Sequence, residues 1–202
     1  TNHALLAIDA LEGVPVLPEH DVVVVDEGHE LVGRVTSVAT AELWPGVVER
    51  AGRRARSYVE GGDADELQDS ADALRSALAE TPPGRLDPPL PEALREAVVR
   101  VRDAARAVQS GFSAGAREER DPDVEAGRRA ARTMVDEVFT TAERMVAESE
   151  HDVVWVEERE RGGQVVRVAP LSVAGLLRER LFGTATVVAT SATLELGGSF
   201  DP

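Results

Sequence analysis

The pattern of apolar positions changes three times along the chain, and each pattern predicts a different kind of element. Near the start, the run Val22–Val25 is apolar without polar alternation and is followed directly by Asp26. Such a run is typical of a strand that is buried on both faces of a parallel sheet. Residues 4–11 have a helical pattern that ends near Gly13 and Pro15. This end of the chain therefore predicts a helix followed by a buried strand.

Between residues 40 and 150, apolar side chains recur with the 3.6-residue period of amphipathic helices. Connectors rich in glycine, proline and aspartate separate four such stripes. The stripes are Leu43, Val47, Ala51 and Tyr58; Leu67, Ala71, Leu74 and Leu78; Leu94, Val98, Val101, Ala105 and Val108; and Ala131, Val135, Val138, Ala142 and Met145. Four helices with short connections predict a helical bundle or a pair of helical hairpins.

After His151 the apolar period becomes 2, which is typical of strands. The segments Val153–Val156 and Val165–Val168 flank a charged turn that contains two glycines, so they predict a β-hairpin. A short helix over residues 173–182 then leads to a second strand, Thr186–Thr190, which we also expect to be buried.

The order strand, helices, hairpin, strand predicts an α/β fold with a large all-α insertion. An insertion between two parallel strands explains why a bundle interrupts an α/β pattern. We therefore expect an α/β part formed by residues 1–39 and 151–202, and a helical domain formed by residues 40–150.

The composition excludes several kinds of binding site from this chain. Its 202 residues contain 37 acidic and 22 basic residues, for a formal net charge of -15, so we expect no indiscriminate binding to polyanions or membranes. All the basic residues are arginines, which excludes a P-loop lysine within the chain. The absence of cysteine excludes a cysteine-ligated cluster. Without an initiator methionine, a leader or a long apolar stretch, the sequence predicts an interior segment of a cytoplasmic protein.

Polar side chains follow both predicted parallel strands. Asp26, Glu27 and His29 follow the first strand. The hydroxyls of Thr190, Ser191 and Thr193 follow the second, where they can hydrogen-bond the acids of the neighbouring strand end. Ligands bind at the carboxyl ends of parallel strands, where one carboxylate can hold Mg²⁺ through water and the next can orient an attacking water. The simpler alternatives are an acidic capping turn for the first group and an N-cap cluster for the second.

Together, the two strand ends resemble motif II (Walker B) and motif III of superfamily 2 helicases, and more closely those of the DinG/XPD-type DNA helicases. Asp26–His29 matches the acidic box, Val188–Leu194 resembles motif III, and Thr1–Leu6 resembles the segment before motif II. This family inserts a helical arch domain between the two motifs. The resemblance implies a partial P-loop NTPase (RecA-like) motor domain, with Val22–Val25 and Thr186–Ala189 paired in parallel.

The resemblance also implies roles for individual residues. Asp26 would hold Mg²⁺ through water, Glu27 would activate water, His29 would couple the nucleotide to other motifs, and Ser191 and Thr193 would link hydrolysis to DNA movement. The implied activity is ATP-dependent 5′–3′ translocation on single-stranded DNA and unwinding of forked duplexes, in repair or replication, by a monomer. An iron–sulfur cluster is possible in the longer protein but not in this chain, which we expect to be inactive alone.

Arg95, Arg102 and Arg106 are spaced so that they share one face of the third predicted helix, where they could form a DNA-contacting ridge. Solvated surface arginines paired with glutamates are the more ordinary explanation. Aromatic residues make up only 3 %, too few for a stacking platform, so we expect Trp44 and Trp155 in the core.

Two other functional classes stay open at the level of sequence. The helices could form a protein-interaction module in which the strands are incidental. The chain could also come from a nuclease related to the DinG family, which would need a further cluster of metal-binding acids that the sequence does not display.

Overall fold

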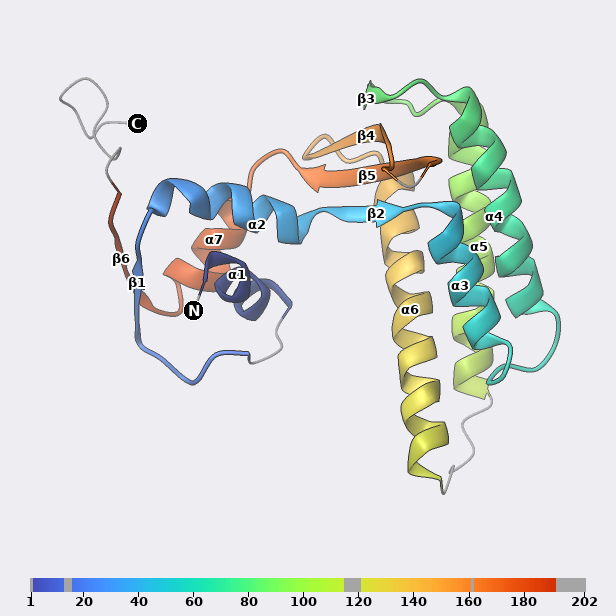
Figure 1. Ribbon diagram of the computed structural model, residues 1–202, viewed down its shortest axis with the longest axis horizontal. Helices are drawn as coiled ribbons and strands as arrows, with labels where there is room; N and C mark the ends of the chain where they lie inside the picture. Colours follow the sequence, from blue (N-terminus) through green and yellow to red (C-terminus); the bar gives the residue numbers. More distant parts are fainter. Residues whose placement is uncertain (1, 13–15, 115–120, 161, 192–202) are drawn as a thin grey trace. The chain divides into compact units, whose positions relative to one another are not determined.

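The computed structural model describes residues 2–12, 16–114, 121–160 and 162–191. The chain divides into two units (Figure 1). The first unit consists of residues 1–40 and 169–202, and the second unit consists of residues 41–168. The described residues combine helices with strands, as the predicted α/β class requires.

The first unit contains two strands and several short helices. Its elements are α1 (His3–Glu12), β1 (Val22–Val25), the 3₁₀ turn η1 (Gly28–Glu30), α2 (Leu31–Ala39), α7 (Ala174–Leu177), the π-helical turn η2 (Arg178–Phe182) and β6 (Thr186–Ala189). Strands β1 and β6 pair in parallel, from Val22 opposite Thr186 to Val25 opposite Ala189. This confirms the predicted pairing of two segments that lie far apart in the sequence.

Only one face of these two strands is buried, so the prediction of burial on both faces is wrong for the described residues. Val25 is 2 % exposed and packs with Leu6, Leu31 and side chains of α7 and η2. Val22 and Val24 are 58 % and 68 % exposed, because successive side chains of a strand point to opposite faces and no described residue covers the second face. The exposed side chain of Val188 in β6 adds to this apolar surface.

Two helical features of the first unit differ from the sequence prediction. Helix α2 follows the acidic turn directly and was not predicted; its side chains Leu31 and Val35, four residues apart, are both buried. The predicted helix over residues 173–182 is present as α7 and η2, in which the hydrogen-bonding pattern changes from α to π at Arg178. Helix α2, helix α7 and the turn η2 all pack apolar side chains into the core of the first unit.

The second unit is built from four helices and a small antiparallel sheet. Its elements are β2 (Ala41–Leu43), α3 (Pro45–Ala55), α4 (Asp63–Glu80), β3 (Gly84–Leu86), α5 (Glu92–Ala114), α6 (Pro122–Val146), β4 (Asp152–Glu158) and β5 (Gln164–Pro170). The helices lie side by side in Figure 1, with the strands at one end of them. None of the described helices is long and apolar enough to cross a membrane.

The predicted stripes of α4, α5 and α6 all lie in one core, where each of their residues is at most 2 % exposed. The first stripe is wrong at both ends. Leu43 belongs to β2, and Tyr58 lies beyond the last residue of α3, Ala55. The helix begins at Pro45 because a proline disfavours helical backbone in the residue before it, and Trp44 is accordingly extended.

The sheet of the second unit has the strand order β2-β5-β4-β3. Strands β4 and β5 confirm the predicted hairpin, but β2 and β3 were not predicted because each has only three residues. These short strands pair with β5 and β4 respectively. The hairpin therefore belongs with the helices, and the boundary between the units lies after Val168, near the end of β5, and not at residue 150.

Candidate functional site

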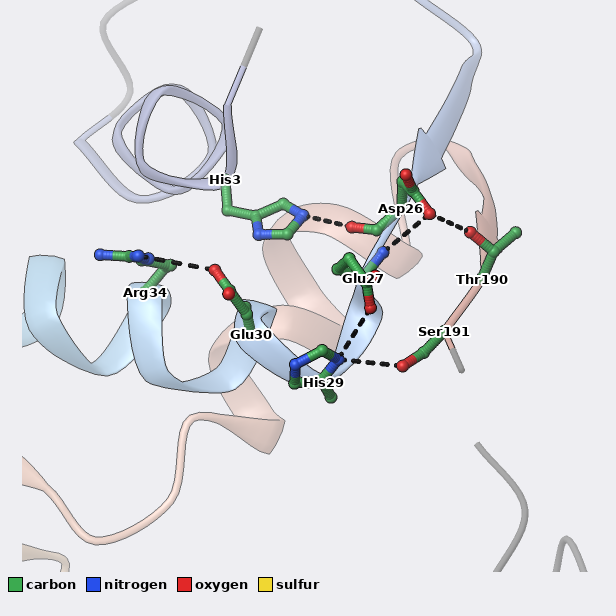
Figure 2. A network of polar contacts seen from close by, with 8 residues as sticks. All are labelled: His3, Asp26, Glu27, His29, Glu30, Arg34, Thr190 and Ser191. Atoms are coloured by element: carbon green, nitrogen blue, oxygen red, sulfur yellow. Dashed lines mark hydrogen bonds and ion pairs between the residues drawn. The ribbon is translucent and has the colours of Figure 1, made fainter. Parts of the chain in front are cut away.

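The ends of β1 and β6 meet at one edge of the parallel pair (Figure 2). The backbone N–H of Thr190 donates to the carbonyl of Val25 over 2.8 Å, and the N–H of Gly28 donates to the carbonyl of Thr190 over 2.8 Å. These bonds continue the pairing beyond the strands. The residues that follow each strand are thereby brought together, although more than 160 positions separate them in the sequence.

Asp26 is held by three hydrogen bonds. Its Oδ1 accepts from the hydroxyl of Thr190 over 2.8 Å and from the backbone N–H of Glu27 over 3.0 Å. Its carbonyl oxygen lies 2.7 Å from Nε2 of His3, at the start of α1. These contacts involve one carboxylate oxygen and leave Oδ2 without a hydrogen bond to the described residues, so the group is both oriented and able to bind a ligand.

Glu27 lies in the turn between β1 and η1 with a left-handed backbone, φ 51° and ψ 49°. This conformation is uncommon for a residue with a Cβ atom, and it marks a turn that the surrounding structure fixes. The carboxylate is 53 % exposed, and its Oε2 lies 3.2 Å from Nδ1 of His29. Glu27 therefore presents its side chain to solvent at the strand edge, beside Asp26.

The imidazole of His29 lies between the two motifs. Its Nδ1 is 2.9 Å from the hydroxyl of Ser191, which follows β6, and 3.2 Å from the carboxylate of Glu27, which follows β1. One nitrogen thus has two partners of different chemistry. A protonated Nδ1 donates to the carboxylate, whereas an unprotonated Nδ1 accepts from the hydroxyl.

The structure brings Asp26, Glu27, His29 and Ser191 together, as expected from the strand pairing, whereas Thr193 lies outside the described residues. The hydrogen bond of Thr190 to Asp26 confirms that a hydroxyl after the second strand bonds an acid after the first, although the sequence did not indicate which hydroxyl. His3, which contacts the carbonyl of Asp26, was not singled out by the sequence. Only the position of His3 in the segment before motif II could have suggested a role at the acidic turn.

The donor set at this edge fits Mg²⁺ bound together with a nucleotide. The described residues contain no cluster of three or more acidic or histidine side chains that could hold a metal by themselves. Mg²⁺ in nucleotide hydrolases commonly keeps several waters and is bound through one or two carboxylates plus the phosphates of the substrate. The free Oδ2 of Asp26 suits such a ligand, and Glu27 stands beside it with its carboxylate exposed.

The three arginines of the predicted ridge do not have equal surroundings. Arg95 lies 3.5 Å from Glu148, and Arg102 lies 3.6 Å from Glu143 of α6. The exposed side chain of Arg106 has no acidic group within 4 Å among the described residues. The positive charge on this face of α5 is therefore partly neutralised, and Arg106 carries most of what is left for a partner.

Comparison with known proteins found relatives that align with the whole chain. No protein-family model matches it. The chain is 43 % identical over 210 aligned residues to "ATP-dependent helicase DinG" of Mycobacterium tuberculosis (strain H37Rv), and the same values hold for the protein of that name in Mycobacterium bovis. The alignment covers 100 % of this chain but only 31 % of each relative. The whole chain is therefore similar to a segment of DinG-type helicases, and it spans about a third of the length of the relatives it matches.

Proposed function

We propose that this chain is the part of an ATP-dependent DNA helicase that contains motif II, the arch domain and motif III. The observation that carries the proposal is the parallel register of β1 and β6, which brings Asp26, Glu27 and His29 beside Thr190 and Ser191. In this proposal the first unit is part of a P-loop (RecA-like) motor domain. The exposed Val22 and Val24 then belong to a sheet face that the rest of the motor domain covers.

Asp26 and Glu27 divide the chemistry of ATP hydrolysis between them. Asp26, oriented by Thr190, would hold Mg²⁺ through water, and the ion supplies neutralisation of the charge that develops on the phosphates. Glu27 accepts a hydrogen bond from the attacking water and aligns it with the terminal phosphate. The exposure of its carboxylate leaves room for that water.

His29 and Ser191 provide the coupling in this proposal. A change in the charge around Glu27 alters which partner Nδ1 of His29 prefers, because that nitrogen contacts both the carboxylate and the hydroxyl. Ser191 follows β6, so the preference of the imidazole is transmitted to the motif III segment. Thr193 is proposed to act in the same segment, toward movement along DNA.

The helices of the second unit are proposed to be the arch domain, which guides the DNA. For the longer protein we propose the properties that the family resemblance implies. It would bind single-stranded DNA, move along it in the 5′–3′ direction and unwind forked duplexes, in repair or replication. Arg106 is the best candidate for a phosphate contact on α5, because Arg95 and Arg102 already pair with acids of the same unit.

The proposal is tested by Glu27→Gln in the full-length protein, with Glu30→Gln as the matched control. Glu30 lies three residues away, is also exposed, and contacts only Arg34 among the described side chains. The glutamine at position 27 keeps the size of the side chain but accepts only weakly from water. We expect at least a hundredfold lower rate of ATP hydrolysis with ATP binding retained, and no comparable loss in the control. Hydrolysis and unwinding at the wild-type rate by Glu27→Gln would overturn the assignment.

A further inference from the structure

The second unit contains a cavity of about 310 Å³ between the start of α3, the end of α4 and the turn that joins β4 to β5. Arginine and tryptophan side chains form much of its wall, and backbone of the turn completes it. The residues that matter here are Trp44, Gly46, Arg75, Arg159, Gly163 and Gln164. Every residue that lines the cavity belongs to the second unit.

Trp44 and Arg159 form a stacked pair in this cavity. The guanidinium carbon of Arg159 lies 3.6 Å from the centroid of the indole ring, and that of Arg50 lies 5.5 Å away. The ring rests against Gly46, where a Cβ atom would come within 2.0 Å of it. Only glycine permits this approach, so the start of α3 fixes the indole, and the indole in turn positions the guanidinium of Arg159.

The charges around this pair leave the cavity positive. Arg75 forms ion pairs with Asp72 and Glu49, and its hydrogen bond to Asp72 in particular raises the pKa of the guanidinium. Glu49, the acid that lines the cavity, is ion-paired in this way, and the lining residues Arg75 and Arg159 together carry one positive charge more than Glu49 balances. Arg159 has no carboxylate within 4 Å in the part of the chain that the structure describes.

Gln164 adds a group with unused hydrogen-bonding capacity. Its Oε1 is buried and has no hydrogen-bond partner among the described residues. A buried polar atom without a partner is costly, so a ligand that lets this amide form hydrogen bonds would be favoured. Rotation of the side chain would direct the amide into the cavity that Gln164 lines.

We propose that this cavity binds one nucleotide of single-stranded DNA, with the base stacked on the Arg159–Trp44 pair. Nucleobases stack on guanidinium planes and aromatic rings, and each such contact tolerates any base because every base has a π-face. The positive charge of Arg159 and Arg50 favours the attached phosphate, and the amide of Gln164 can bond the edge of the base. The expectation that Trp44 and Trp155 are core residues is wrong, because both side chains are only partly buried.

This inference rests on the proposed function, because it specifies where the arch domain holds its strand. It is tested first in the 202-residue chain by tryptophan fluorescence. The sequence contains two tryptophans, so Trp155→Phe leaves Trp44 as the only source of tryptophan emission. Addition of an oligodeoxythymidylate is expected to quench this emission in a saturable way. Unchanged emission over the range in which the oligonucleotide binds would contradict the proposal.

The second test is Arg159→Lys in the full-length protein, with Arg53→Lys as the matched control. Lysine keeps the charge but lacks the planar guanidinium that stacks, so this variant separates stacking from simple attraction. We expect the Kd for the oligonucleotide, measured by fluorescence anisotropy, to rise about tenfold in Arg159→Lys. Arg53 is exposed on α3 and does not line the cavity, so its variant is expected to bind as the wild type does.

The results separate this inference from the function on which it rests. Wild-type affinity in Arg159→Lys, together with lost hydrolysis in Glu27→Gln, would overturn the nucleotide site and leave the helicase proposal in place. Weakened binding in Arg159→Lys, together with wild-type hydrolysis in Glu27→Gln, would support a DNA site and remove the proposed catalytic role.

Discussion

The hydroxyl of Thr190 donates a hydrogen bond to Oδ1 of Asp26 over 2.8 Å, although 164 positions separate the two residues. All the helices of the second unit lie between them in the sequence. The contact exists because β1 and β6 pair in parallel and end at the same edge. It joins the acid proposed to hold Mg²⁺ to the segment proposed to respond to hydrolysis.

Thr190→Val in the full-length protein tests this contact. Valine has nearly the shape of threonine but cannot donate, so Asp26 loses one of the two donors to its Oδ1. We expect about tenfold slower ATP hydrolysis, because a net hydrogen bond to a charged group contributes about 1.5–3 kcal/mol. Thr190→Ser retains the hydroxyl and is expected to restore most of the rate. Equal rates in the valine and serine variants would show that the hydroxyl is not needed.

Ser191→Ala tests the proposed coupling through His29. The variant removes one of the two partners of Nδ1 and leaves Glu27 and Asp26 in place. We expect ATP hydrolysis to stay within a few-fold of the wild-type rate while duplex unwinding falls at least tenfold.

Ser37→Ala is the matched control for this variant. Its hydroxyl is exposed and donates only to the carbonyl of Gly33 within α2, so both activities should remain. Parallel losses of hydrolysis and unwinding in Ser191→Ala would indicate damage to the catalytic site and not lost coupling.

Much of this arrangement could be predicted from the sequence. The buried stripes of α4, α5 and α6 follow from the spacing of leucine, valine and alanine, because these helices contact one core along their length. The meeting of Asp26 with the residues after β6 follows from parallel pairing, which places both strand ends at one edge.

Other features depend on tertiary contacts that leave little trace in a local pattern. Strand β3 follows two prolines and has only three residues, so its pairing with β4 has no local signal. The position of Trp44 depends on Gly46 and on Arg159, which the β4–β5 hairpin brings from more than a hundred residues away. The bond of His3 to the carbonyl of Asp26 likewise needs the packing of α1 into the core of the first unit.

Asp9 gives a prediction about pH. Its carboxylate accepts from the backbone N–H groups of Leu17 and Val16, over 2.8 and 2.7 Å, and these bonds, that of Leu17 foremost, lower the pKa of Asp9 below its ordinary 3.8. A lowered pKa in the folded state contributes stability above the unfolded value, and that contribution is lost as pH falls through the folded value.

The measurement is urea unfolding of the wild type and of Asp9→Asn at pH 7, 5 and 3. Asparagine keeps an acceptor oxygen but has no charge. The wild type is expected to be the more stable of the two at pH 7 and 5, and the difference should shrink at pH 3. A difference that stays constant across the three pH values would show that the charge of Asp9 does not contribute.

Arg106→Glu tests whether α5 contacts DNA. Arg95 and Arg102 are unsuitable for charge reversal, because each would then place two carboxylates together, with Glu148 and Glu143 respectively. For Arg106→Glu we expect weaker binding to single-stranded DNA, and a slope of log affinity against log salt that is shallower by about 0.7.

Arg100→Glu is the matched control on the same helix. Arg100 is exposed and lines a hollow together with Glu66, Glu96 and Asp103, where a DNA phosphate would be repelled. Equal effects of the two reversals would point to net charge, and no effect of Arg106→Glu would make Arg106 an ordinary solvated side chain.

The two carboxylates at the end of β1 are proposed to have different tasks in ATP hydrolysis. The most direct measurement is the Mg²⁺ dependence of ATP binding and turnover in the full-length protein, compared between Asp26→Asn and Glu27→Gln. Asp26→Asn is predicted to need at least tenfold more Mg²⁺ for ATP binding. Glu27→Gln is predicted to bind Mg²⁺ and ATP as the wild type does and to lose turnover. The same Mg²⁺ dependence in both variants, or full turnover in either, would contradict this division of tasks between Asp26 and Glu27.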